Sequence, residues 1–360
     1  NGKLLSTDRT WEVIKNYNIG LDFGFLDNRL TGTAELFWKK CNNMLIDVTY
    51  PGTLGDKAPT ANRGSFKANG WEGTINWSDK IGEISYHLGG TFTYTTNKLV
   101  DNGGDAVIKS GVVSNREGYP LNSVFGLKYC GKIQTQDQLD KYINQYANGN
   151  NNIAMPGNLR LGDNMYEDVN KDGKLTEADY VYLGTDDPKV SFSFNAGLSW
   201  KGFDVSVIFQ GAGKRTVWRG GENNQKGKND NWRIPMMSWY NNSTNQSVGN
   251  VWSAETPNAH YPTYTHQTQI NLYNYICSSW SVEDGAYLRL KNVTLGYTFP
   301  ANVLSKTKFI SYARIYVSGA DLWENSKIKD GWDPEASRKV ETFGRYPFTR
   351  NLTVGLNLTF

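Results

Sequence analysis

Apolar residues alternate with small polar residues over long stretches of this sequence. From Val190 to Trp200, VSFSFNAGLSW, every second residue is apolar, and serine, asparagine and glycine stand between them. The end of the sequence, NLTVGLNLTF, repeats the pattern up to Phe360. Because a β-strand turns successive side chains to opposite faces, each stretch has one apolar face and one small, polar face. The pattern predicts an all-β, antiparallel fold.

Nine segments share this alternation, and each is at least as long as the roughly 9–11 residues that a tilted membrane strand needs. They are 14–26, 29–40, 66–77, 83–96, 189–201, 203–214, 285–299, 309–321 and 346–360. Aromatic residues end many of the apolar faces, as in the girdles at a membrane–water interface. These residues are Phe25, Trp38, Trp77, Trp200, Phe203, Phe299 and Phe360. We therefore expect a transmembrane β-barrel, with a soluble β-sandwich as the alternative.

Short and long connections alternate between these segments. The short ones are 26–29, 78–83 and 201–204, with 300–309 of moderate length, and the long ones are about 46–65, 97–188, 215–284 and 322–345. Outer-membrane barrels have short periplasmic turns and long extracellular loops, so we expect the C-terminus in the periplasm. Residues 124–133 could form a tenth strand. That strand would break the alternation, so we expect it inside the long outer loop 97–188.

Nine strands cannot close a barrel by themselves. An open sheet would leave two unpaired edges in the hydrocarbon of the membrane, which is costly. We therefore expect residues 1–360 to be the C-terminal part of a longer barrel protein.

The composition excludes several other classes of protein. The net charge of +3, without a block of lysine or arginine, does not suggest a nucleic-acid partner. Three widely spaced cysteines and three histidines predict neither a disulfide framework nor a zinc site. The sequence contains none of the common catalytic motifs, such as G-x-S-x-G or H-E-x-x-H, so we do not expect an enzyme.

Several stretches, in order and over nearly the whole chain, resemble SusC/RagA-type TonB-dependent transporters of Bacteroidota. They are YNIGLDFGFLDNRLTGTAELFWKK, YEDVNKDGKLTEADYVYLGTDDPKVSFSFNAGLSWKGFDVSVIFQGAGKR, YLRLKNVTLGYTFP, VSGADLWENSKIKDGWDPEAS and YPFTRNLTVGLNLTF. The resemblance implies a barrel of about 22 strands around a plug, in the outer membrane of a Gram-negative bacterium. It also implies TonB-driven import of oligosaccharides or peptides beneath a SusD-like surface lipoprotein. Nothing here matches the plug, the TonB box or the first barrel strands, so contact with TonB is expected through a region outside this sequence.

The segment 168–179, DVNKDGKLTEAD, resembles the calcium loop of an EF-hand. Calcium takes about six to eight oxygen ligands. The predicted ligands are Asp168, Asn170, Asp172, Lys174 through its carbonyl, Thr176 and Asp179, with Gly173 at the sharp bend. The short side chain of Asp179 at the twelfth position also makes magnesium a candidate. We expect a structural clip that orders the loop, and the alternative is a solvated turn without metal, because the same residue types favour turns.

Aromatic and amide side chains are frequent in the long loops, and such side chains bind sugars or peptides. The predicted substrate-binding residues are Trp218, Trp232, Trp239, Tyr240 and Trp252. The alternative is that these aromatics pack the loops against each other or against a partner. The terminal Phe360 resembles the signal that the barrel-assembly machinery reads at the end of an alternating strand.

Three functions remain open at this point. The first is import of nutrients through the outer membrane. The second is glycan binding by a calcium-containing surface β-sandwich. The third is a structural barrel within a larger outer-membrane assembly.

Overall fold

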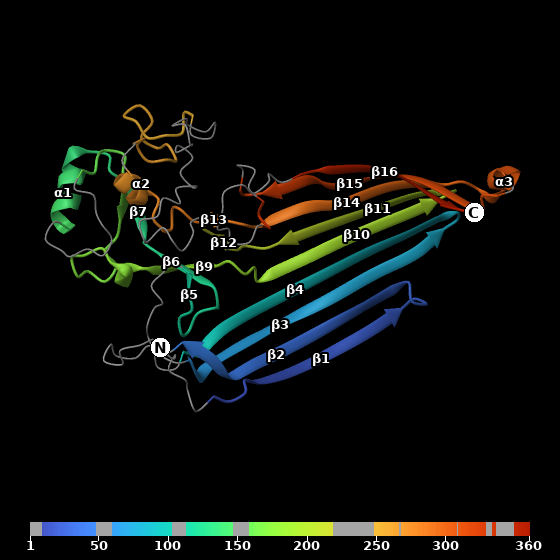
Figure 1. The fold of residues 1–360 in the computed structure, drawn as a ribbon, viewed down its shortest axis with the longest axis horizontal. Helices are drawn as coiled ribbons and strands as arrows, with labels where there is room; N and C mark the ends of the chain where they lie inside the picture. The colour runs from blue at the N-terminus through green and yellow to red at the C-terminus, as the bar shows by residue number, and fades with distance from the viewer. Residues whose placement is uncertain are drawn as a thin grey trace, which may run out of the picture.

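The computed structural model describes residues 9–47, 60–102, 113–146, 158–218, 248–265, 268–307, 309–328, 333–335 and 349–360. Nine of its strands form one antiparallel sheet (Figure 1). In sheet order they are β1 (Val13–Phe25), β2 (Leu30–Asp47), β3 (Thr60–Ile81), β4 (Ile84–Asn102), β10 (Val190–Trp200), β11 (Phe203–Ala212), β14 (Tyr287–Thr298), β15 (Tyr312–Ser326) and β16 (Asn351–Thr359). Every predicted segment corresponds to one of these strands, which confirms the antiparallel β-fold.

The register places all the apolar faces on one side of the sheet. Leu36 on β2 stands opposite Ile19 on β1 and opposite Trp71 on β3. These side chains are exposed, at 47%, 68% and 45% respectively. We call this apolar side the outer face. An apolar face that is exposed across nine strands is the surface that a membrane barrel presents to lipid, and a sandwich would bury it.

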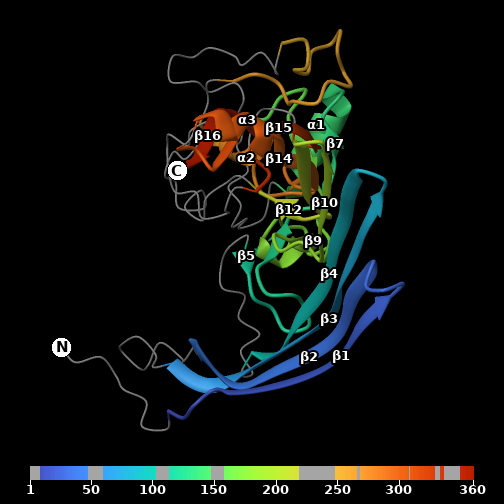
Figure 2. The same cartoon turned by 90° about the vertical axis from the view of Figure 1, so that its right-hand side faces the viewer.

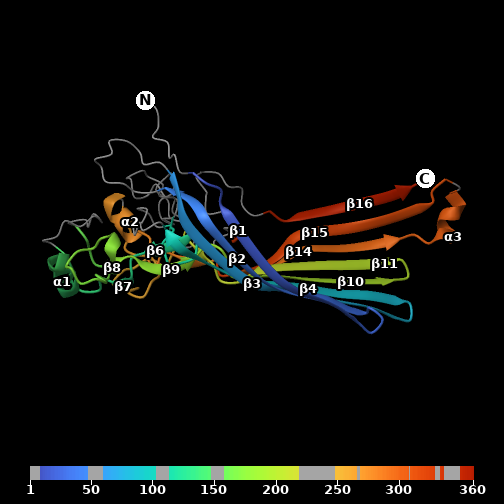
Figure 3. The ribbon, with the colours of Figure 1, turned by 90° about the horizontal axis from the view of Figure 1, so that it is seen from below.

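The sheet is curved, and its short connections all lie at one end (Figures 2 and 3). The β1–β2 turn places Leu26, Asp27 and Asn28 at positive φ, and Gly82 and Gly202 do the same in two other turns. The β14–β15 connection holds the short helices α3 (Ala301–Leu304) and η4 (Ser305–Thr307). The opposite end, where the long connections leave the sheet, is called the loop end below.

A small folded unit, the loop domain, stands at the loop end (Figures 1 and 3). Its elements are β5 (Val113–Ser114), β6 (Ser123–Gly126), β7 (Tyr129–Lys132), α1 (Gln136–Tyr146), β8 (Asn164–Tyr166), η2 (Glu177–Asp179), β9 (Val181–Thr185), β12 (Thr216–Val217), α2 (Thr268–Asn274) and β13 (Glu283–Asp284). Residues 124–133 thus form β6 and β7, which lie outside the nine-stranded sheet. The alternation of short and long connections predicted this position within the loop 97–188.

The strands differ in length more than the alternation predicts. β3 has 22 residues and β16 has nine. β4 continues to Asn102, so it takes up the first residues of the predicted loop 97–188. Among the described residues, no helix is long and apolar enough to cross a membrane.

Candidate functional site

The face of the sheet opposite the apolar one, the inner face, is lined by paired polar side chains. Hydroxyl groups meet across neighbouring strands at Thr33 and Thr74, 2.8 Å apart, and at Thr91 and Ser193, 2.7 Å apart. Because each hydroxyl both donates and accepts, such pairs satisfy one another without a charge. The inner face therefore offers a polar surface along which a hydrated solute could pass.

An ion network crosses this inner face near the loop end. Arg289 on β14 is 1% exposed, and its guanidinium binds the carboxylates of Glu324, Asp333 and Glu335. The nearby Lys291 ammonium lies 3.2 Å from Glu335. Burial of a guanidinium is tolerated only when its charge is compensated, and three carboxylates do so here. The network therefore ties the segment 333–335 to the wall formed by β14 and β15.

A second ion pair lies at the other end of the inner face. Arg314 on β15 donates from Nε to Asp204 on β11, at 2.9 Å, and a second donor reaches the other carboxylate oxygen at 2.5 Å. This two-point contact is the fixed geometry that guanidinium and carboxylate groups favour. It braces β15 against β11 across the intervening strand β14.

The loop domain is held together by a core rich in tyrosine. The Tyr142 hydroxyl lies 2.6 Å from the Tyr273 hydroxyl and accepts a hydrogen bond from the backbone N–H of Tyr166, at 2.9 Å. The Tyr166 hydroxyl in turn donates to the carbonyl oxygens of Tyr273 and Asn274. Burial raises the pKa of Tyr142 and of Tyr273, so these phenols stay neutral. The core joins α1, β8 and α2.

A buried amide–carboxylate set continues this core. Asn164 donates two hydrogen bonds of 2.8 Å to Asn274, from its backbone N–H to the side-chain oxygen and from its amide to the backbone carbonyl. The Asn274 amide donates in turn to Asp163, at 2.8 Å. The backbone N–H of Arg160 donates to the other oxygen of Asp163, at 2.7 Å. Burial raises the pKa of Asp163, against the opposing effect of these donors. The set fixes the strand that leads into the EF-hand-like loop.

The predicted cation ligands at the two ends of the EF-hand-like loop are buried and hold backbone N–H groups. Asp168 accepts from Asp172 at 3.2 Å and from Gly173 at 2.7 Å. Asp179 is fully buried and accepts from Val169, at 2.9 Å. It also accepts from Asn170 at 3.3 Å and from Thr176 at 2.8 Å. Asp168 and Asp179 thus close the loop from both ends.

The remaining predicted ligands lie on the exposed side of the turn. Asn170 accepts from the backbone N–H of Asp172, and Asp172 accepts from the N–H of Lys174, both at 2.9 Å. Thr176 caps η2 by accepting from Ala178, at 3.1 Å. Within the described ranges, no three His, Cys, Asp or Glu side chains are arranged as a ready metal site. The donor set is that of a hard cation, and the loop brings its oxygens to one turn; the metal itself stays a prediction.

The predicted substrate-binding aromatics do not form one surface. Trp218 is 9% exposed and packs against Val124 and Cys277. The Trp252 indole donates to the side-chain oxygen of Gln134, at 2.8 Å. Trp232, Trp239 and Tyr240 lie outside the described residues. Their proposed contact with substrate is therefore untested, and Trp218 has little free ring surface.

The structure brings together a different aromatic group, which we call the Trp280 cluster. It consists of Val251, His260, Tyr261, Tyr264, Tyr275 and Trp280. The His260 ring lies 5.3 Å from the Trp280 ring, and the Tyr275 ring lies 5.4 Å from it. Sequence reasoning missed this group. The many aromatic residues in SAETPNAHYPTYTH indicated that an aromatic group could form in this loop. The sequence did not indicate which rings would be in contact.

Phe360 lies at the end of the sheet with its ring exposed, and it stacks on Phe309 with ring centroids 6.4 Å apart. Both rings stand at the short-turn end of the outer face. This place suits an interfacial girdle residue. Recognition of Phe360 by an assembly machinery stays a prediction.

The nine-stranded sheet and its loop domain recur in known proteins. TonB-dependent receptor P26 of Formosa agariphila is 26% identical over 380 residues, which cover 100% of this chain and 36% of that protein. TonB-dependent receptor SusC of Bacteroides thetaiotaomicron is 23% identical over 376 residues, which cover 99% of this chain and 33% of that protein. The chain is similar to TonB-dependent receptors, SusC among them, over nearly its whole length. No family model matches it.

Solved structures agree with this relationship. The RagAB peptide importer in its open-open state superposes with a TM-score of 0.74 at 21% identity, covering 98% of this chain and 35% of that chain. A further structure of the RagAB peptide transporter gives a TM-score of 0.70. The nine strands and the loop domain therefore have the fold of about a third of the matched RagAB chain. The chain spans about a third of the length of the relatives that it matches.

Proposed function

We propose that this chain forms part of the wall and outer loops of an outer-membrane transporter that imports oligosaccharides or peptides with energy from TonB. The observation that carries the proposal is the sheet itself. It exposes an apolar, aromatic-bordered face on one side and a polar, hydroxyl-lined face on the other, and the chain that contains it superposes on the RagAB importer over 98% of its length. Only a barrel wall between lipid and an aqueous lumen needs both faces.

The proposed partners follow from the same relationship. A SusD-like surface lipoprotein would cover the loop end, where the loop domain stands, and TonB would act through a region outside this sequence. The C-terminal strand would end in the periplasm. The alternative of a purely structural barrel differs in one respect, since it predicts no TonB-dependent uptake.

The substrate class is proposed from the loops. The Trp280 cluster presents the half-buried rings of Tyr261, Tyr264 and Trp280 beside the polar side chains of the loop domain. Sugars and peptides both bind such surfaces, through ring faces and amide hydrogen bonds. The predicted residues Trp252, Trp232, Trp239 and Tyr240 would add to this surface, whereas Trp218 packs separately against Val124 and Cys277.

Uptake by cells tests the proposed function. Cells that carry the full-length protein would be given fluorescently labelled oligosaccharides and peptides, with and without functional TonB. We expect one labelled class to accumulate only when both the protein and TonB are present. Equal accumulation without TonB would contradict import and would favour the structural barrel.

A bound divalent cation in the loop 168–179 is a separate proposal. Asp168, Asn170, Asp172, the Lys174 carbonyl, Thr176 and Asp179 would hold calcium, or magnesium, which would supply structural order only. Its support is the placement of Asp168 and Asp172 on one tight turn around Gly173. Phe360 is proposed in the same way as part of the signal for barrel assembly.

A further inference from the structure

Four lysines form an unbroken row across the outer face of the sheet. The register pairs Lys15 on β1 with Lys40 on β2, Lys40 with Lys67 on β3, and Lys67 with Lys98 on β4. Residues paired in this way project from the same face of the sheet, with their Cβ atoms about 4.5–5.5 Å apart. We call these four residues the lysine row.

Among the described residues, no carboxylate forms an ion pair with the lysine row. All four side chains are exposed, and in the described part of the chain none of them makes an ion pair or hydrogen bond. Like charges placed directly opposite one another on neighbouring strands destabilise a sheet. An anion bound from outside the protein would relieve the repulsion among these four charges.

The position of the row along the strands indicates where this anion lies. Tyr17 and Trp38 form the next outward-facing pair below Lys15 and Lys40, and Ile19 and Leu36 form the pair after that. The series runs from charged to aromatic to aliphatic. This is the order of headgroup, interface and acyl chains that a barrel surface meets in a membrane. The lysine row therefore stands at the level of the lipid headgroups, at the loop end.

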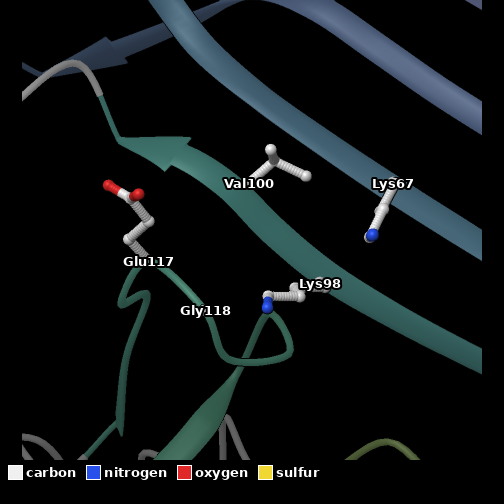
Figure 4. A pocket seen from close by; sticks show the side chains of 5 residues that line it. All are labelled: Lys67, Lys98, Val100, Glu117 and Gly118. Atoms are coloured by element: carbon white, nitrogen blue, oxygen red, sulfur yellow. The ribbon is translucent and has the colours of Figure 1, made fainter.

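A depression beside the row provides space for a headgroup. Lys67, Lys98, Val100, Glu117 and Gly118 line an open hollow of about 300 Å³. Figure 4 shows the two lysines on neighbouring strands β3 and β4, with the turn that carries Glu117 beside β4. Glu117 contributes one negative charge next to this end of the row, so the row keeps an excess of positive charge.

We propose that the lysine row binds the phosphate groups of an anionic membrane lipid in the leaflet at the loop end. The ammonium groups would bind phosphate, Trp38 and Tyr17 would lie at the interface, and the aliphatic residues below would contact the acyl chains. The inference rests on the proposed place of this sheet in the outer membrane. The binding itself involves neither substrate nor TonB.

Native mass spectrometry of the full-length protein in detergent tests the proposal. The protein would be titrated with lipid A that carries two phosphates, with the same lipid after dephosphorylation, and with inorganic phosphate. The test variant is Lys40→Gln combined with Lys67→Gln. The matched control is Lys39→Gln, since Lys39 stands next to Lys40 on the opposite face of β2 and pairs with Asn16.

We expect the double variant to bind the phosphorylated lipid roughly 25-fold more weakly, at about fivefold for each lysine. Lys39→Gln should bind as the unchanged protein does, and Lys40→Arg combined with Lys67→Arg should keep most of the affinity. This charge-conserving pair separates a loss of charge from a folding defect.

Three results would overturn the proposal. They are unchanged binding by the double glutamine variant, equal binding of the dephosphorylated lipid, or displacement of the lipid by an equal concentration of inorganic phosphate. Failure of the proposed import function is distinguishable, because the lipid titration needs no uptake. A protein that binds the lipid through the row but imports nothing would refute only the import.

Discussion

Arg289 on β14 stands directly opposite Glu324 on β15 in the strand register, and its Nε donates to the Glu324 carboxylate at 2.8 Å. The same guanidinium binds Asp333 at 2.7 Å. Glu335, two residues later, lies 3.2 Å from it. One buried cation therefore connects two strands of the inner wall with a segment of the last long connection.

Arg289→Gln should release the segment 333–335 from the wall. Removing one partner of a buried ion group leaves uncompensated charge, at a cost of about 3 kcal/mol. The Glu335 N–H donates to Asp333 at 2.9 Å, so its hydrogen exchange reports on the segment. We expect this amide to exchange much faster in the variant.

Arg314→Gln serves as the matched control for that experiment. It breaks the ion pair with Asp204 at the other end of the same wall and should leave the exchange of the Glu335 amide unchanged. If both variants speed the exchange of the Glu335 amide equally, the wall loosens as a whole and Arg289 does not specifically fix the segment 333–335.

Asp168→Ala combined with Asp172→Ala should loosen the loop around 168–179 and leave the nine strands intact. The variant loses the oxygens that accept the N–H groups of Gly173 and Lys174, and it loses two proposed cation ligands. Limited proteolysis with and without calcium would measure both effects. Calcium should protect the unchanged protein and should not protect the variant.

Protection of both proteins by calcium would place the cation elsewhere, and protection of neither would favour the metal-free turn. If the variant barrel fails to assemble at all, the interpretation of the loop as a local clip is wrong.

Tyr142→Phe should destabilise the loop domain by about 1–3 kcal/mol, since a buried donor that loses its acceptor bears the full desolvation cost. The donor in question is the Tyr166 N–H, which now bonds to the Tyr142 hydroxyl. Hydrogen exchange at Tyr166 would measure the free energy of local opening. Tyr119→Phe is the control, because the Tyr119 side chain is partly exposed and its contacts with Phe125 and Tyr182 are made by the ring.

Acidification should loosen the Trp280 cluster through His260. Burial, aided by Lys132, lowers the pKa of His260 below its ordinary 6.5. A histidine with a lowered folded pKa contributes its full stability above the unfolded pKa. That contribution falls as the pH drops below about 6.5, and solvent around the exposed His260 keeps the loss small.

Exchange of the Trp252 amide, which donates to the Tyr261 carbonyl at 3.0 Å, would report this loosening between pH 7.5 and 5.5. His260→Gln should abolish the pH dependence, and His87→Gln on β4 should preserve it. A pH dependence that survives His260→Gln would assign the titration to another group.

The membrane-spanning part of the fold is predictable because its physical signal is local. A strand between lipid and water must alternate, so each of the nine strands is visible in its own residues. The alternation of apolar and polar residues ends where the strands leave the lipid. β3 begins at Thr60 and β4 reaches Asn102, because backbone pairing continues above the lysine row while the apolar alternation does not.

The loop domain was predictable only in part. Leu139, Tyr142 and Tyr146 are three and four residues apart and are all buried on α1, which is a helical spacing that a window over 136–146 would find. The contact between Tyr142 and Tyr273 joins residues 131 positions apart. Nothing in either segment alone specifies that partner, and the same is true of Arg289 and Asp333.

The unequal strands give the opening of the wall an uneven height. At roughly 3.3 Å per residue, β3 extends for about 70 Å and β16 for about 30 Å, compared with an apolar band about 25 Å tall. Within the described strands, β3 therefore reaches far beyond the apolar band at the loop end. A partner that seats on this part of the wall would meet a raised rim.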